Sequence, residues 1–237
     1  MTSSLKERLF HEVLPALGKD AAYFSFNQIK AAVAARRLGI ADASLKVYLN
    51  EALRKGVIHD AGRGWYSRLS EPVPLDGKPV ATFIRALAKK LPLLNFTCWS
   101  TAQINPWMHH LLAQPVVFLY VPGDALESVG ETLSGLGWQT AANPGVADAA
   151  KLVRPGPKMV VLRPARSKQP EGEGHQAPVE KLLVDLVEES ADTSLMDSSE
   201  AQGVIKAILG RYLLQVATLQ SYAERRGVKL KALEAIN

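Results

Sequence analysis

The sequence of 237 residues contains a single cysteine, Cys98, so it cannot form an intramolecular disulfide. Cys98 lies in an apolar stretch, which predicts a buried thiol and a reducing compartment. No run of about 18 uncharged apolar residues occurs, so we expect no membrane-spanning helix. The opening residues, Met-Thr-Ser-Ser-Leu-Lys-Glu-Arg, also lack the apolar core of a signal peptide. These absences predict a cytoplasmic protein without a membrane partner.

Sequence motifs of catalysis and cofactor binding are missing too. There is no GxGxxG or GxxxxGK[ST] glycine pattern, no HExxH and no paired CxxC. His109 and His110 are adjacent, and neighbours on a helix diverge by roughly 100°, so this pair cannot share a metal ion. Ser100 lacks the flanking glycines of a nucleophile elbow, and we expect it to cap a helix. The sequence therefore predicts no enzyme, no cofactor and no metal site.

Charge is distributed unevenly along the chain. Residues 1–78 hold 12 basic and 8 acidic residues, and residues 79–170 hold 9 and 4. Residues 171–237 hold 7 basic and 11 acidic residues. The first two segments are therefore basic and the last is acidic. This distribution suits a protein that binds nucleic acid near its N-terminus and another partner near its C-terminus. Accidental asymmetry of a solvated surface is the alternative.

Residues 25–67 carry the pattern of two helices joined by a turn. Ser25 or Asn27 can cap the first helix, which runs into Arg36-Arg37 before a Leu-Gly-Ile turn. The apolar face of this helix consists of Ile29, Val33 and Ala34. Asp42 or Ser44 can cap the second helix. Its apolar residues recur at helical spacing and are Leu45, Tyr48, Leu49, Ala52 and Leu53.

A short hairpin follows the second helix. Gly56 occupies the place of a left-handed C-terminal cap. The strand-like residues 57–59 and 65–67 flank a tight loop with Arg63 at its tip, and we expect Tyr66 to pack beneath the hairpin. Helix, turn, helix and hairpin in this order is the winged-helix plan, and such modules usually bind duplex DNA.

The surface chemistry of this module favours DNA as its partner. The outward face of the second helix carries groups that suit phosphate oxygens and base edges, and the exposed Val47 suits a thymine methyl. The predicted DNA-binding residues are Arg36, Arg37, Ser44, Lys46, Asn50, Arg54 and Arg63. An ordinary helical subdomain, or a winged helix that contacts protein, is the alternative.

The remaining sequence predicts a mixed α/β (α+β) protein of two domains. The winged helix occupies residues 1–70, proline and glycine mark a linker at 71–79, and a second domain occupies 80–237. Strands separated by helices predict a small α/β sheet with a helical tail. The expected helices are 81–91, 101–112, 125–136, 179–189, 199–209, 212–226 and 230–236, and the expected strands are 93–99, 116–121, 138–141 and 158–163.

Glu180, Lys181 and Asp185 form a charged group on the first tail helix. Lys181 and Asp185 are four residues apart, so they can pair on one helical face. A buried ion pair that anchors the tail is the favoured interpretation. Clustered acids with a lysine also occur in metal-dependent nucleases, which leaves a nuclease as an alternative.

Several short motifs, in their order, resemble the AbiEi family of antitoxins from type IV toxin-antitoxin systems. Residues 94–99 running into Ser-Thr-Ala resemble a recurring element of that family. The hairpin residues 63–66 are similar to its Arg-Gly-apolar-Tyr sequence. Residues 180–186 resemble a family motif in which Pro-Glu-Lys is followed by an apolar run and Asp-Leu. This sequence departs from the motif at one position, because Val179 separates the proline from Glu180. Residues 221–227 resemble its final helix.

This resemblance implies a regulator with two roles. The winged helix would bind the promoter of its own operon as double-stranded DNA, with inverted repeats as the expected operator. The larger domain would support an antitoxin role against a nucleotidyltransferase-like toxin, and direct contact with that toxin is not required. A winged-helix transcription regulator that responds to a ligand and has no toxin partner is the alternative.

Overall fold

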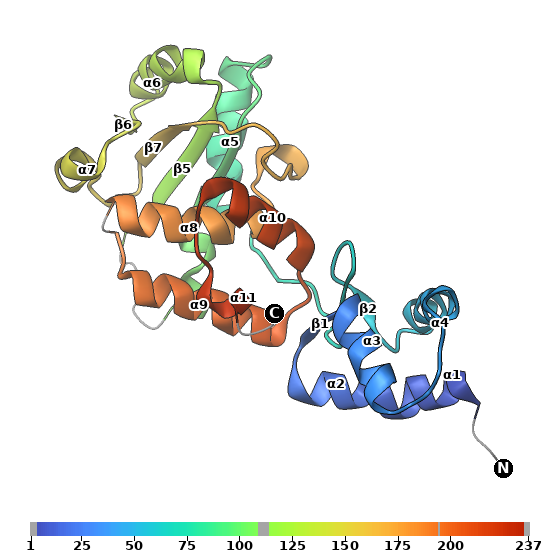
Figure 1. Cartoon of the computed structure of the whole chain (residues 1–237). Coiled ribbons are helices and arrows are strands. Elements are labelled where there is room, and N and C mark those ends of the chain that lie inside the picture. Colours follow the sequence, from blue (N-terminus) through green and yellow to red (C-terminus); the bar gives the residue numbers. More distant parts are fainter. Residues whose placement is uncertain (1–3, 109–113, 194, 235–237) are drawn as a thin grey trace. The chain divides into compact units, whose positions relative to one another are not determined.

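The computed structural model describes residues 4–108, 114–193 and 195–234 (Figure 1). The chain divides into two compact units. Unit 1 comprises residues 1–73, 206–221 and 230–237, and unit 2 comprises residues 74–205 and 222–229. Within the described ranges, no helix is both long and apolar enough to cross a membrane. The protein is a mixed α/β molecule, as the sequence predicts.

Unit 1 has the winged-helix fold. Its three-stranded antiparallel sheet has the order β1–β3–β2. The predicted helix-turn-helix and hairpin are confirmed, but the first strand of the hairpin is residues 59–60 and not the predicted 57–59. Strand β1 and the helical stretch before it were not predicted. The elements are α1 (Leu5–Arg8), the π-helical turn η1 (Leu9–Val13), α2 (Leu14–Asp20), β1 (Tyr23–Ser25), α3 (Phe26–Ala35), α4 (Asp42–Arg54), β2 (His59–Asp60) and β3 (Trp65–Ser67).

Local sequence signals account for the helices of the module. The Ser25 side chain accepts a hydrogen bond from the backbone N–H of Gln28, and the Gln28 side chain accepts one from the Ser25 N–H. Gly56 has a φ of +66°, which matches the predicted cap after α4. The buried core includes the predicted apolar residues of both helices, among them Ile29, Val33, Leu45 and Leu49. Amphipathic spacing therefore predicts this core well.

Two details of the predicted module are wrong. The residue that caps α4 is Ala41, which makes no side-chain cap, while Asp42 is already helical and forms an ion pair with Lys30 at 2.6 Å. Ala34 is exposed rather than buried. It follows Ile29 by five residues, which turns it about 140° away from the buried face.

The tail contributes to both units, in contrast to the predicted second domain at 80–237. Residues 206–221 belong to unit 1, and their backbone forms hydrogen bonds with its N-terminal part. The Tyr23 hydroxyl donates to the Tyr212 carbonyl and accepts from the Leu214 N–H. The Ala217 N–H donates to the Ala61 carbonyl at 3.2 Å, so the tail also holds the hairpin loop.

Unit 2 is built on the predicted α/β sheet. Its elements are α5 (Lys78–Lys90), β4 (Thr97–Ser100), η2 (Thr101–Gln103), η3 (Asn105–Trp107), β5 (Val116–Val121), η4 (Gly123–Ala125), α6 (Leu126–Gly135), β6 (Gln139–Ala142), α7 (Val146–Leu152), β7 (Met159–Pro164), η5 (Glu173–His175) and α8 (Val179–Thr193). Helices α9 (Ser198–Arg211) and α10 (Val216–Arg226) contribute residues to both units, and α11 (Lys231–Glu234) belongs to unit 1.

The four-stranded sheet has the order β4–β5–β7–β6, with β5, β7 and β6 parallel and β4 antiparallel. Side chains alternate between its two faces. Val117 and Leu119 share a core with residues of α5 and α6. Tyr120 points to the other face, where its hydroxyl contacts Glu189 of α8. Helices thus cover both faces, which explains why β5 is buried throughout and apolar along its length.

Some predicted elements of unit 2 differ from those observed. The strand predicted at 93–99 begins only at Thr97, and Leu93 is 98% exposed. The described part of the helix predicted at 101–112 consists of the short turns η2 and η3, and α7 was not predicted. Ser100 caps the turn after β4, and Cys98 is fully buried, so both of these predictions are confirmed.

Candidate functional site

The outward face of α4 is the first candidate site. Lys46, Asn50 and Arg54 follow one another at intervals of four residues, which places them on one stripe of the helix. All three are exposed, and Ser44 near the helix start is exposed as well. Val47 lies on the same side with 61% of its surface exposed. An apolar group among cationic and amide groups matches the chemistry of a major groove.

Cations of this module fall into two groups according to their partners. Lys30 pairs with Asp42, and Lys55 pairs with Glu51 at 2.9 Å. In the described part of the chain, by contrast, the Arg54 side chain has no hydrogen bond or ion pair. Lys46 has no carboxylate partner there, and its Nζ lies 5.8 Å from the centre of the Phe26 ring. The second group therefore keeps its positive charge available for phosphate oxygens.

The wing places a third exposed cation. Arg63 lies between Gly62 and Gly64, whose φ values of +95° and +76° favour glycine and make the tight loop possible. The Gln215 side chain donates to the Asp60 carbonyl at 3.3 Å, which ties the loop from the tail side. Arg63 itself is exposed, so its guanidinium group is accessible to solvent.

Arg36 and Arg37 lie at the end of α3 and in the turn after it. Both side chains are exposed. Arg36 donates to the Ala32 carbonyl at 3.3 Å, while Arg37 occupies a left-handed backbone position with a φ of +52°. The seven predicted DNA-binding residues are thus all accessible within unit 1.

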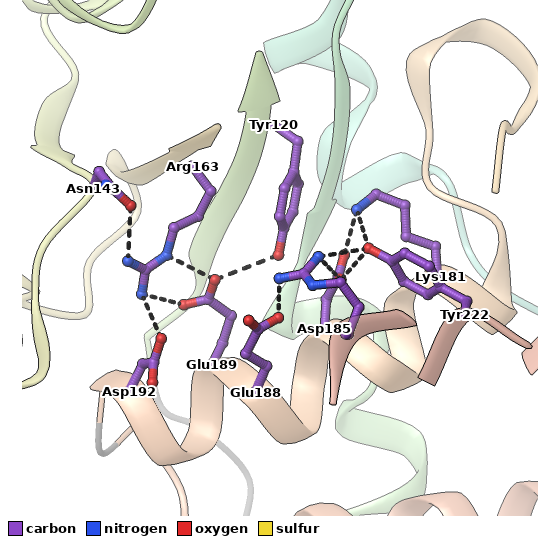
Figure 2. A network of polar contacts seen from close by, with 10 residues as sticks. Tyr120, Asn143, Arg163, Lys181, Asp185, Glu188, Glu189, Asp192 and Tyr222 are labelled. Carbon is purple, nitrogen blue, oxygen red and sulfur yellow. Dashed lines mark hydrogen bonds and ion pairs between the residues drawn. The ribbon is translucent and has the colours of Figure 1, made fainter. Parts of the chain in front are cut away.

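A buried network of charges in unit 2 is the second candidate site (Figure 2). The predicted ion pair is confirmed: Lys181 Nζ lies 2.6 Å from Asp185 Oδ2, and both side chains are fully buried. The Tyr222 hydroxyl donates to Asp185 Oδ1 at 2.8 Å and accepts from Lys181 and Arg226. Arg226 also contacts Asp185 and Glu188. Each oxygen and cation of this group has a partner inside the protein.

A second ion pair continues this network along α8. Arg163 donates from Nε and Nη2 to the two carboxylate oxygens of Glu189, both at 2.8 Å. Its Nη1 donates to Asn143 Oδ1 at 3.3 Å and to the Pro144 carbonyl at 2.8 Å. This bidentate contact fixes the orientation of the guanidinium group relative to α8, as Figure 2 shows.

Burial shifts the pKa values of these groups. Loss of hydration lowers the pKa of Lys181 and raises the pKa of Asp185, and their mutual attraction does not fully compensate. Burial likewise raises the pKa of Glu189 despite its bonds to Arg163. Burial and the charges of Asp185 and Glu189 hold the pKa of Tyr120 well above its usual value. These charges are therefore costly to keep in the interior and depend on their partners.

The sequence prediction identified only part of this network. Glu180 is buried too, at the start of α8. Tyr222 and Arg226, from the segment that resembles the final AbiEi helix, were not predicted to contact Asp185. Their spacing of four residues places them on one helical face, which is the only signal that the sequence offers. Nothing in the sequence pairs Arg163 with Glu189, 26 residues away.

The histidine pair considered for metal binding, His109 and His110, lies outside the described residues. Among the residues that the structure does describe, no group of three or more His, Cys, Asp or Glu side chains could hold a metal ion.

Fold and sites together define a winged-helix protein with an α/β unit that contains buried ion pairs. The chain belongs to a family of unknown function, DUF6577, whose model matches residues 44–237. No curated protein matches the sequence. The matched range begins in α4 and includes the wing and the complete α/β sheet.

Proposed function

We propose that this protein is a DNA-binding antitoxin of a type IV toxin-antitoxin system, which represses its own operon through the winged helix. The observation that carries the proposal is the exposed face of α4, where Lys46 and Arg54 lack carboxylate partners in the described chain and flank the exposed Val47. The motif resemblance to the AbiEi family supplies the antitoxin role.

In this proposal α4 enters the major groove. Asn50 and Val47 lie on its outward side and are suited to an adenine edge and a thymine methyl. Arg54, and Arg63 from the wing, bind phosphates on either side of the groove. Arg36 and Arg37, at the end of α3, add further backbone contacts.

One winged helix reads few base pairs, so two or more copies bind an inverted repeat in the promoter. The second partner is a nucleotidyltransferase-like toxin, which the antitoxin counteracts with or without direct contact. In this role the antitoxin is not an enzyme and needs no cofactor. Because its operon and toxin are in the cytoplasm, we expect the protein there as well.

Fluorescence anisotropy with the DNA upstream of the protein's own gene tests the repressor role. We expect tight binding to this duplex and weak binding to a scrambled duplex of the same composition. A Lys46→Ala, Arg63→Ala double variant should lose most of the affinity for the upstream duplex. The matched control is Lys89→Ala, Lys90→Ala, which removes two exposed cations of α5 and should bind like the wild type.

Equal affinity for both duplexes would contradict the repressor role, as would unchanged binding by the double variant. The antitoxin role has its own test, in which the neighbouring toxin gene is expressed with or without this protein. Growth that recovers only in the presence of the antitoxin supports that role. Continued growth arrest would overturn it and would leave the repressor role standing.

A further inference from the structure

A polar pocket of about 450 Å³ adjoins the buried network of unit 2. Six residues line it, all from this unit: Arg166, Ser167, Glu188, Tyr222, Arg225 and Arg226. The first two lie two and three residues after the end of β7, and the others come from α8 and α10. A volume of this size suits a ligand of about the size of a nucleotide.

The position of the pocket in the fold is that of a ligand site. Strand β7 ends at Pro164, so Arg166 lies at the carboxyl end of the parallel strands. A smaller neighbouring pocket of about 90 Å³ shares Arg166, Glu188 and Arg226 and extends to Asn143, which follows the carboxyl end of β6. Ligands of open α/β sheets bind outside this edge of the sheet.

The charges of the lining favour an anion, since three arginines face one glutamate. Among the described residues, the exposed Arg166 side chain has no hydrogen bond or ion pair. Arg225 is held in place by a hydrogen bond from its Nη2 to the Lys168 carbonyl at 2.9 Å. Guanidinium groups match the geometry of phosphate oxygens better than ammonium groups do.

We propose that this pocket binds the phosphate group of a small phosphorylated molecule. Arg166 and Arg225 bind the phosphate directly. Arg226 reaches it when the phosphate competes with Glu188, whose carboxylate pairs with Arg226 in the structure described here. The proposal is independent of DNA binding, because none of these residues belongs to unit 1.

Isothermal titration calorimetry of the full chain tests the proposal with inorganic phosphate, adenosine 5′-monophosphate and adenosine as probes. The two phosphate compounds should bind, and adenosine should not. The Arg166→Ala and Arg225→Ala variants should each weaken binding about tenfold, as expected for a hydrogen bond to a charged group. Arg154→Ala removes an exposed arginine of the same unit outside the pocket and should change nothing.

The variant Glu188→Gln gives the sharpest readout, because it should bind phosphate more tightly, about threefold or more, once the competing carboxylate is neutral. Weaker binding by this variant would contradict the competition. Absence of heat from both phosphate compounds at millimolar concentration would overturn the site, as would equal losses in Arg154→Ala and Arg166→Ala. Displacement of bound phosphate by duplex DNA would identify the pocket as a DNA contact instead.

Discussion

The two units use the same residue types in opposite ways. On the winged helix, Arg54 and Arg63 are exposed and have no hydrogen bond or ion pair among the described side chains. In the α/β unit, Lys181 is fully buried and Arg163 nearly so, and each is bonded to a carboxylate. The first arrangement keeps positive charge available for a partner, whereas the second pairs charge inside the protein, and the Arg163–Glu189 pair joins β7 to α8.

This difference shows that the role of a charge follows from its surroundings and not from its spacing along the chain. Lys181 and Asp185 are four residues apart, and so are Glu51 and Lys55. Both pairs form, but only the first is removed from water. A surface pair contributes about 0 to 1 kcal/mol, whereas loss of one partner from a buried pair costs about 3 to 5 kcal/mol.

The largest effect should come from substitution within the buried network. Asp185→Leu leaves Lys181 and Arg226 without their shared carboxylate, so we expect a loss of about 3 to 5 kcal/mol in the free energy of unfolding. Lys181→Met should cost less, because Asp185 keeps its bonds to Arg226 and Tyr222. Urea denaturation measures both. An equal or larger loss in Lys181→Met would contradict the central place of Asp185.

The same variant should show a pH dependence of known sign. Burial lowers the pKa of Lys181 in the folded protein, so the contribution of this lysine to stability is lost as the pH falls through that lowered value. Without Asp185 the pKa should fall further. The deficit of Asp185→Leu relative to the wild type should therefore shrink as the pH rises from the lowered pKa of Lys181 towards about 10, where an unfolded lysine also loses its proton. A constant deficit would contradict the buried charge as its cause.

The second prediction contrasts two adjacent cations at the end of α4. Arg54→Ala should weaken binding to the upstream duplex by about 1 to 3 kcal/mol. The slope of log K against log salt concentration should decrease by about 1, which corresponds to the loss of one phosphate contact. Lys55→Ala should have a smaller effect, because Glu51 already neutralises Lys55. Anisotropy titrations at several salt concentrations give both values. Equal effects of the two substitutions would show that pairing does not decide which cations bind DNA.

The third prediction concerns the wing and the tail segment that holds it. A Cβ added at Gly62 would lie 2.7 Å from the Cβ of Ala217, in addition to the strained φ of +95°. Gly64 has a similar strain but open space around it. Gly62→Ala should therefore reduce the free energy of unfolding by about 2 to 3 kcal/mol, and Gly64→Ala by about 1 kcal/mol. Equal values from thermal denaturation would argue against the contact with Ala217.

The smallest effect should separate two serines of the module. Ser25→Ala removes a capping box and should cost about 1 kcal/mol of stability without changing the proposed DNA-binding face of α4. Ser44→Ala removes an exposed hydroxyl inside α4 and should leave stability unchanged while weakening DNA binding slightly. Stability and affinity are measured on both variants. The reverse pattern would show that Ser44 has a structural role.

The sequence predicts the elements of this protein better than their partners. Helical spacing identified the cores of α3 and α4, and the uninterrupted apolar run identified β5 with its observed bounds. Strand β1 was missed because three residues give no measurable alternation, and its pairing with β3 joins segments about 40 residues apart. Periodicity reports local structure, whereas this pairing depends on the folded chain.

The candidate sites show the same division. Exposure of Lys46, Asn50 and Arg54 could be predicted, since it follows from the amphipathic pattern of one helix. The contacts of Asp185 with Tyr222 and Arg226 could not be predicted, because they join residues of two helices that are 37 and 41 positions apart in the sequence. Assignment of tail residues to unit 1 depends on backbone bonds, which no side-chain pattern reveals.

DNA binding by the outward face of α4 can be tested most directly by disulfide cross-linking. Cys98, the only cysteine, is buried and its pKa is raised by that burial, so an introduced cysteine is the reactive thiol. Val47→Cys should cross-link to an upstream duplex that carries a thiol-tethered base, and not to a scrambled duplex. Leu93→Cys, at a position that is 98% exposed in unit 2, should not cross-link to either. Equal cross-linking of both variants, or none at Val47→Cys, would contradict DNA binding by this helix.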